Sequence, residues 1–284
     1  MSEIGRNIKE RTSYNKFRSQ QRDRDNVARR GYTNWLYDER DLADRDCFFD
    51  DASKVCNTEK PLICIDVEAH ERDHSKITEV GVAIYTPAES RGSIVPYIRS
   101  VHMIIAENQH LRNKSYVPDH MYNYNGGKSL LMTLDEAAEA IQRSINQLSG
   151  DDIGQGICIV GHGMEHDLEW LDQMGVEIGI ADKFDTQDFL HLTHQGRYSS
   201  LEFALRLVRQ PYAFLHNAGN DAYYTLLLAL CLGDPLYRIP AQIDSVERMG
   251  MFRCRQKSGV GPNASLSVNG SLQRYQKYLN NQPI

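Results

Sequence analysis

The sequence has no long apolar run and no paired cysteine motif, and both absences narrow what it can encode. Among its 284 residues, no apolar run is long enough to span a membrane, and residues 1–26 are polar and charged where a signal peptide would be apolar. The six cysteines include no C-x-x-C pair, and three of them lie inside apolar runs. Scattered thiols of this kind are typical of reduced, buried cysteines. We therefore expect an intracellular protein, cytoplasmic or nuclear, that is neither secreted nor membrane-bound.

The charge of the chain is unevenly distributed. Residues 1–35 carry nine Lys/Arg against four Asp/Glu, and residues 246–284 carry six against one, although the net charge of the whole chain is −6. Two basic ends on an acidic body fit contacts with nucleic-acid phosphates, and they equally fit flexible ends that aid solubility. We predict a charged extension and linker at 1–60, a folded domain at 61–235 and a basic, partly flexible tail at 236–284.

The stretch Pro61–Glu68, PLICIDVE, predicts a buried strand with two acids at its end. Residues i and i+2 of a strand face the same side, so Asp66 and Glu68 project together while Val67 points into the core. Neighbouring carboxylates repel each other and are costly to bury unless a positive charge lies between them. A lone D-x-E also occurs on solvated strands, so the pair gains meaning only if further acids join it.

The rest of the body alternates between strand and helix patterns. Further strands are predicted at 77–86, 101–107 and 157–160 and, within 183–190, near Asp185. Helices are predicted at 134–148, 165–174, 200–208 and 221–232. Three successive strands with short links imply antiparallel pairing, whereas later strand–helix alternation implies parallel strands. We therefore expect an α/β fold whose mixed sheet has helices on both faces.

Two later blocks supply further acids. The first contains Gly161-His162 followed by Asp167, at the start of a predicted helix, where an acid commonly just complements the helix dipole. The second is HNAGNDA, in which His216 stands five residues before Asp221. Asn217 and Asn220 are candidate N-caps for the helix that carries Asp221.

Read in order, the motifs D-x-E, G-H-x-x-x-x-D-L and H-x-A-x-x-D-A resemble those of the DEDD exonucleases. Within that family they resemble the subgroup that has a histidine five residues before the last aspartate, and the matched region runs from 61 to 233. The resemblance implies a ribonuclease H-like fold. The chain differs from most relatives at Ala69, where they have threonine, and at Gly163, where asparagine is frequent. Asp185 stands where related RNA exonucleases often have Asp-Thr, and we interpret it as structural support.

The motifs also indicate a site. The four carboxylates of Asp66, Glu68, Asp167 and Asp221 suit two divalent cations, and oxygen ligands favour Mg²⁺ or Mn²⁺. His216 suits the role of general base because its pKa lies near neutrality. The candidate substrate-binding residues are Ala69, His162, Arg18, Arg22, Arg253 and Arg255.

The resemblance implies a metal-dependent 3′→5′ exonuclease that releases nucleoside 5′-monophosphates. HNAGNDA and the D-V-E-x-x-E opening, which ends at Glu71, look like a fungal branch linked to messenger RNA export and Argonaute-dependent silencing, so we favour RNA. The expected partner is single-stranded nucleic acid, with a possible protein partner for the N-terminal extension. Two alternatives are a nucleic-acid-binding adaptor with little catalysis and a DNA-directed exonuclease.

Overall fold

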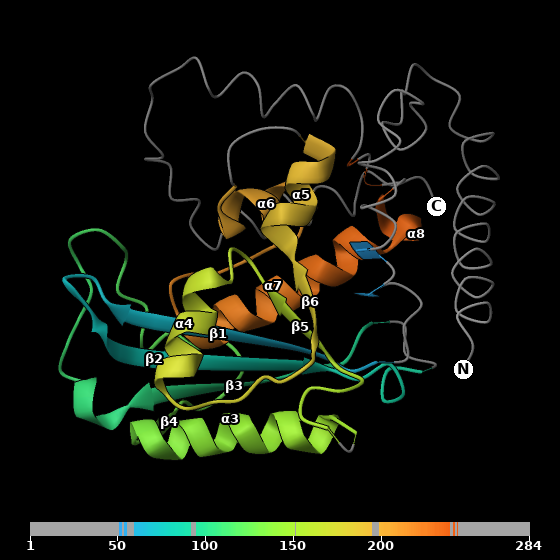
Figure 1. Cartoon of the computed structure of the whole chain (residues 1–284). Helices are drawn as coiled ribbons and strands as arrows, with labels where there is room; N and C mark the ends of the chain where they lie inside the picture. The colour runs from blue at the N-terminus through green and yellow to red at the C-terminus, as the bar shows by residue number, and fades with distance from the viewer. Residues whose placement is uncertain are drawn as a thin grey trace, which may run out of the picture.

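The computed structural model describes residues 51–52, 54–55, 60–91, 95–150, 152–194, 199–238, 241 and 243. Its described part is built on one mixed sheet of six strands in the order β4-β3-β2-β1-β5-β6 (Figure 1). The strands are β1 Leu62–His70, β2 Asp73–Tyr85, β3 Ile98–Ile105, β4 Leu130–Met132, β5 Cys158–Gly161 and β6 Asp182–Asp185. The pairs β1–β2 and β2–β3 are antiparallel, and β1–β5, β5–β6 and β3–β4 are parallel. The α/β fold class with a ribonuclease H-like mixed sheet is therefore confirmed.

Helices cover both faces of this sheet. They are α3 Leu134–Leu148, α4 Glu165–Gln173, α5 Thr186–His194, α6 Leu201–Leu207, α7 Ala218–Gly233 and α8 Pro235–Arg238, with a 3₁₀ turn, η3, at Ala106–Asn108. In Figure 1, α3 lies along one face, and α7 crosses the other. The long helices predicted from apolar spacing are present, whereas β4 and α8 were not predicted because each is only three or four residues long.

The strand predicted near Asp185, within 183–190, is confirmed as β6, whereas the helix that follows it, α5, was not predicted. Only Asp182–Asp185 forms β6, and the chain enters α5 at Thr186. The Asp185 carboxylate accepts hydrogen bonds from the backbone N–H groups of Gln187 at 2.8 Å and Gly163 at 2.9 Å. A carboxylate that binds the first N–H groups of a helix favours helix over continued strand. The interpretation of Asp185 as structural support is confirmed by these contacts.

The alternation within β1 decides which side chains face which helix. Ile63, Ile65 and Val67 join the core beneath α3, while Leu62 and Cys64 join the core beneath α7. The same period of two continues along the strand, so Asp66 and Glu68 face the α7 side. The burial of Val67, which is 5% exposed, confirms its predicted inward direction.

The core beneath α7 also includes residues outside the predicted 61–235 domain. Ala52, Val55, Ala241 and Ile243 are buried there, and the guanidinium of Arg238 donates to the Leu232 carbonyl at 2.9 Å. Arg18, Arg22, Arg253, Arg255 and the predicted tail beyond Ile243 lie outside the described residues.

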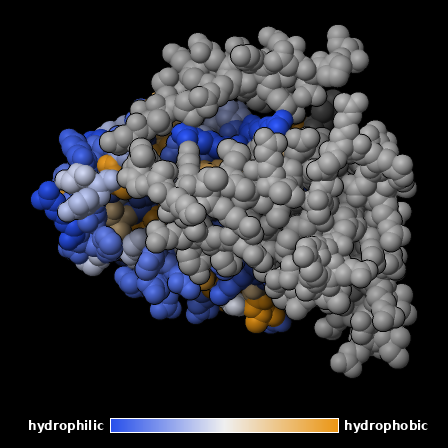
Figure 2. All heavy atoms as spheres, turned by 90° about the horizontal axis from the view of Figure 1, so that it is seen from above, coloured by the Kyte–Doolittle hydropathy of each residue, from blue (hydrophilic) through white to orange (hydrophobic). Residues whose placement is uncertain are grey.

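The surface seen in Figure 2 is mainly hydrophilic over the described residues, with hydrophobic ones scattered singly. Across the described ranges, no helix is both long and apolar enough to cross a membrane. Cys64, Cys158 and Cys231 are free and buried, as the apolar runs around them predict.

Candidate active site

The four predicted acids come from three different elements that meet at the end of β1. Asp66 and Glu68 lie on β1, Asp167 lies in the first turn of α4, and Asp221 lies in the first turn of α7. The Asp167 carboxylate accepts a hydrogen bond from the Val67 N–H at 2.9 Å, which holds the start of α4 against the strand between the two β1 acids. The structure therefore brings together residues that are more than 150 positions apart in the sequence.

Glycine lets the start of α7 approach this cluster. Gly81 on β2 pairs with Asp66 on β1 and with His102 on β3. A Cβ at Gly81 would lie 1.9 Å from the Ala218 carbonyl oxygen, so only glycine at this position leaves room for the first turn of α7. A Cβ at Gly219 would in turn lie 2.6 Å from the His102 Cβ. The close contact of α7 with the sheet positions Asp221 beside the acids of β1.

Burial is the main cause that raises the pKa of all four acids. Burial, followed by the charges of Asp167 and Asp221, raises the pKa of Asp66 well above its usual value. Burial and the charge of Asp221 raise the pKa of Glu68 in the same direction. Burial raises the pKa of Asp167 to about 7 and that of Asp221 to about 8. Four acids held this close together form a site of strongly negative potential.

The ligand atoms fit a hard divalent cation. One Asp221 oxygen accepts from the His216 N–H at 2.8 Å, but its Oδ1 is buried and has no hydrogen-bond partner among the described residues. Ligand atoms of Glu68, His216 and Asp221 lie within 4.8 Å of one another. A buried carboxylate oxygen without a donor is costly unless a cation or water completes it, and carboxylate oxygens are the ligands that Mg²⁺ and Mn²⁺ prefer.

His216 lies at the rim of the cluster. Its Nδ1 is 4.0 Å from the Glu68 Oε1, and its side chain is 45% exposed. Partial burial lowers its pKa, and nearby His120 lowers it further. The backbone φ of His216 is +65°, in the left-handed region that is unfavourable for residues other than glycine. Such strain persists only where the surroundings fix the backbone, and here both flanking contacts, to Asp221 and through Asn217, do so.

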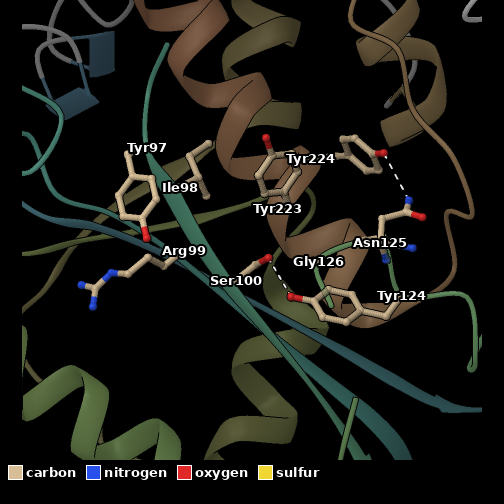
Figure 3. A pocket seen from close by; sticks show the side chains of 10 residues that line it. Tyr97, Ile98, Arg99, Ser100, Tyr124, Asn125, Gly126, Tyr223 and Tyr224 are labelled. Carbon is tan, nitrogen blue, oxygen red and sulfur yellow. Dashed lines mark hydrogen bonds between the residues drawn. The ribbon is translucent and has the colours of Figure 1, made fainter. Parts of the chain in front are cut away.

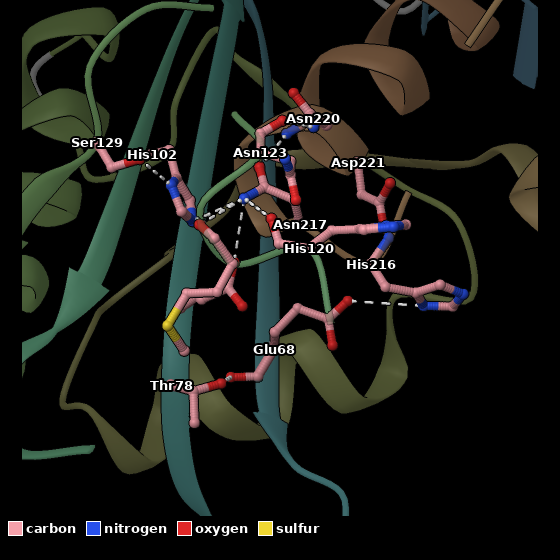
Figure 4. A network of polar contacts seen from close by, with 12 residues as sticks. Glu68, Thr78, His102, His120, Asn123, Ser129, His216, Asn217, Asn220 and Asp221 are labelled. Atoms are coloured by element: carbon pink, nitrogen blue, oxygen red, sulfur yellow. Dashed lines mark hydrogen bonds and ion pairs between the residues drawn. The ribbon is translucent and has the colours of Figure 1, made fainter. Parts of the chain in front are cut away.

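A buried polar network lies directly behind His216 (Figure 4). Glu79 and His102 are both buried, and the His102 Nε2 lies 2.8 Å from the Glu79 Oε2. The Asn217 amide donates to Glu79 at 3.3 Å and to the carbonyls of His120 and Met121 at 3.1 Å each. Its side-chain oxygen caps α7 by accepting from the Asn220 N–H at 3.1 Å, which confirms Asn217 as the N-cap. The network fixes the segment that carries His216 and Asp221.

Sequence reasoning missed Glu79 and His102. Glu79 is the one charged residue of the strand pattern ITEVGV, and His102 is the one polar residue of VHMII. These interruptions are the signal that could have identified them. Asn220, the other proposed cap, instead fastens the preceding loop by donating to the carbonyls of Asn123 and Phe214 at 3.0 Å each.

Two of the predicted substrate-binding residues, His162 and Ala69, make contacts within the protein. Both ring nitrogens of His162 bond to protein groups, Nδ1 to the Thr186 hydroxyl at 2.8 Å and Nε2 to the Ser199 carbonyl at 2.7 Å, so this geometry favours a structural role for the ring. Ala69 is buried in β1, and its carbonyl accepts from Asn113 at 3.0 Å. Gly163 has a φ of +75°, a conformation that asparagine also tolerates, which explains why the two residues can alternate there. Contact of these residues with substrate stays a prediction.

Comparison with known proteins identifies the family. A DEDDh family model described as "DNA polymerase III subunit epsilon-like, C-terminal domain" matches residues 61–232. The chain belongs to this family. The match confirms the resemblance drawn from the three motifs, and it spans all six strands of the sheet together with α3 to α6 and nearly all of α7.

Similar proteins occur in yeasts. Uncharacterized protein YDR514C of Saccharomyces cerevisiae is 39% identical over 216 residues, covering 68% of this chain and 44% of that protein. "Good for full DBP5 activity protein 2" of the same yeast is 36% identical over 209 residues, covering 64% and 37%. An uncharacterized nucleolar protein, C2C4.08 of Schizosaccharomyces pombe, is 28% identical over 180 residues, covering 60% and 68%. The aligned part of this chain therefore spans less than half of the two S. cerevisiae relatives.

Proposed function

We propose that this chain is a metal-dependent 3′→5′ exonuclease that hydrolyses nucleic-acid phosphodiesters and releases nucleoside 5′-monophosphates. The observation that carries the proposal is the cluster of four buried acids with raised pKa values, one of which, Asp221, has a buried Oδ1 without a hydrogen-bond partner among the described residues. In a purely structural cluster, Lys or Arg side chains would pair with these carboxylates. In a cluster that binds divalent cations, the carboxylates have no such partners and can bind the metal.

Each residue then has a defined task. Asp66, Glu68, Asp167 and Asp221 would hold two divalent cations, Mg²⁺ or Mn²⁺. When bound, such cations supply positive charge for the leaving oxygen and lower the pKa of water. His216 would accept the proton of the attacking water, for which a partly exposed imidazole with a lowered pKa is suited because it is neutral at physiological pH. The Glu79–His102–Asn217 network would hold that imidazole in position.

RNA is the favoured substrate, on the resemblance to the fungal branch. DNA is the second candidate, because the matched family model is named after a DNA polymerase subunit. Ala69, which lacks the threonine hydroxyl of most relatives, is a point at which contact with the terminal nucleotide would change. The complete set of acids together with His216 argues against an adaptor without catalysis.

The expected partner is a single strand of nucleic acid. Arg18, Arg22, Arg253 and Arg255 in the basic ends are the candidates for contacts with its phosphates, since arginine binds phosphate and stacks on unpaired bases. The alternative for the N-terminal extension is docking to a protein. Removal of the extension separates the two roles, because only loss of phosphate contacts would flatten the salt dependence of RNA binding.

The test uses 5′-labelled single- and double-stranded RNA and DNA with the purified chain in Mg²⁺, Mn²⁺ or EDTA. We expect single-nucleotide shortening from the 3′ end in either metal and none in EDTA, with RNA cut faster than DNA. Asp66→Asn should abolish shortening. The matched control is Asp135→Asn, the same acid-to-amide change in the exposed first turn of α3, which should leave the rate unchanged. Equal rates for the wild type and Asp66→Asn would refute the proposal.

A further inference from the structure

A cavity lies beside the first turn of α7, and none of the four acids lines it. It has a volume of about 540 Å³, within the range of sites that bind small molecules. Three segments line it: the start of β3, the loop that follows His120, and α7 (Figure 3). The residues that line it include Tyr97, Arg99, Tyr124, Asn125, Tyr223 and Tyr224.

Helix geometry separates this cavity from the acids while keeping the two close. Asn220, Tyr223 and Tyr224 have the i, i+3, i+4 spacing that puts side chains on one face of α7, and all three line the cavity. Asp221 follows Asn220 and so points roughly 100° further around the helix. The Asn125 N–H donates to the Asn220 side chain at 2.9 Å, which ties the cavity wall to the turn that carries Asp221.

Four of the ten residues that line the cavity are tyrosines, and the neighbours of Tyr124 hold its ring in place. The Tyr124 hydroxyl bonds to the Ser100 hydroxyl at 2.8 Å. A Cβ on Gly126 would lie 2.2 Å from the Tyr124 hydroxyl oxygen, so glycine leaves the space that this ring occupies. The rings of Tyr223 and Tyr224 meet edge to face, with centroids 5.5 Å apart, and Tyr97 is 56% exposed at the opening. Ring faces and edges are thus presented to the cavity in a fixed arrangement.

The polar groups at the cavity suit a planar heterocycle. The Asn125 amide makes only long hydrogen bonds, 3.3 Å to the Ala213 carbonyl and 3.5 Å to the Tyr224 hydroxyl, so it can turn toward a base edge. Arg99 borders the cavity, but its side chain points away from Tyr124 and Tyr223 and pairs with Glu89 at 3.4 Å (Figure 3). Tyrosine rings are the groups on which unpaired bases stack.

We propose that this tyrosine cavity binds an unpaired nucleobase. The inference rests on the proposed function, because it supplies a second contact for the strand being hydrolysed, on a different face of α7 from the acids. The same chemistry would accept a free nucleoside monophosphate, so the experiment must separate a base within a strand from a free nucleotide.

The experiment measures binding to the full chain in EDTA, where hydrolysis cannot occur. The probes are adenosine 5′-monophosphate, ribose 5-phosphate as the matched ligand without a base, and a short single-stranded RNA. We expect the nucleotide to bind more tightly than ribose 5-phosphate, and Tyr97→Ala and Tyr223→Ala each to weaken binding of the base-containing probes by about tenfold, as loss of one stacking ring does. Tyr122→Ala, at a tyrosine that is 60% exposed and outside the cavity, is the control and should change nothing.

A second variant keeps all four rings. Gly126→Ala should weaken binding as well, because the new methyl group displaces Tyr124. If the variants weaken binding of the RNA and of the free nucleotide, the cavity accepts both; if they weaken binding of the RNA alone, it accepts a base only within a strand. Wild-type affinities that all of the cavity variants retain would overturn the inference. Hydrolysis by the wild type in Mg²⁺ is scored separately, so failure of the cavity and failure of the proposed nuclease remain distinguishable.

Discussion

The two faces of the sheet are built on different principles. On one face, α3 packs Ala137, Ile141 and Ile145 into an apolar core and begins with a capping box in which Thr133 and Glu136 bond to each other's backbone N–H. On the other face, the first turn of α7 buries Asn217, Asn220 and Asp221, all polar, against the sheet. The first arrangement obeys the general rules of helix stability, whereas the second buries groups that need specific partners.

The groups that destabilise the fold lie at the start of α7. Within the described residues, Asn217 and Asn220 find partners but one oxygen of Asp221 does not, and the backbone of His216 is held at positive φ. Unpartnered and strained groups gather at sites where they serve function. We therefore expect substitutions near α7 to change chemistry and those beneath α3 to change stability.

Among substitutions that keep all four acids, the largest effect is expected for His216→Ala. Loss of a general base typically lowers a rate by about 10²–10⁴-fold, and substrate binding should persist because the acids remain. The unfolding free energy should change little, since the ring is 45% exposed. The measurement is the single-turnover rate on saturating RNA, with His110→Ala, at another exposed histidine, as the control.

The pH dependence of the wild-type rate adds a second readout for His216. The imidazole must be neutral to accept a proton, so the rate should fall as the pH drops through its pKa. Because burial and His120 lower that pKa, the fall should lie at lower pH than for a free histidine. If a His216→Ala variant keeps the wild-type rate and the same fall in rate at low pH, His216 is not the general base.

Features with a fixed period or a motif could be predicted from the sequence. The alternation in PLICIDVE was enough to place Asp66 and Glu68 on one side, and the apolar spacing of α3 located that helix to the residue. The order of the three motifs identified the family. These features depend on local patterns that a short stretch of chain carries by itself.

Features that depend on contacts between distant segments could not be predicted. The role of Gly81 becomes visible only when α7 lies on it, and nothing near Glu79 indicates that His102 and Asn217 will surround it. The tyrosine cavity draws on residues from 97 to 224, so no window of sequence contains it. The strand near Asp185 was predicted but the helix after it was not, because that helix starts where the Asp185 carboxylate accepts from the Gln187 N–H.

An intermediate effect is expected for Gly81→Ala. The added methyl group would lie 1.9 Å from the backbone oxygen of Ala218, so α7 must move, and the unfolding free energy should fall by about 3 kcal/mol or more. The folded fraction should also lose activity, because Asp221 moves with the helix. Denaturant unfolding and the rate per folded molecule are the two measurements.

Two variants calibrate the Gly81→Ala result. Gly150→Ala is the matched control, since its new methyl group would meet only the end of the Gln155 side chain at 3.1 Å. Ile141→Ala beneath α3 should cost about 2–5 kcal/mol through the cavity it leaves, yet the folded fraction should keep its rate. An Ile141→Ala protein that is stable but inactive would contradict the division between the two faces.

The smallest effect is expected in the pH dependence of thermal stability without metal. An acid whose pKa is raised on folding holds a proton that the unfolded chain releases, so its contribution to stability falls as the pH rises. For Asp221, with a folded pKa of about 8, that fall should extend from about pH 4 to about pH 8. Asp221→Asn removes the contribution, so the Tm of the variant should rise relative to that of the wild type as the pH rises, by an amount on the order of 5 °C.

Added Mg²⁺ should stabilise the wild type more than the variant, because a cation bound to the folded state alone raises Tm and Asp221 would be one of its ligands. A difference in Tm that stays constant from pH 5 to pH 8, with equal shifts in Mg²⁺, would show that Asp221 is neither strained by its neighbours nor a ligand, and the contrast between the two faces would then rest on packing alone.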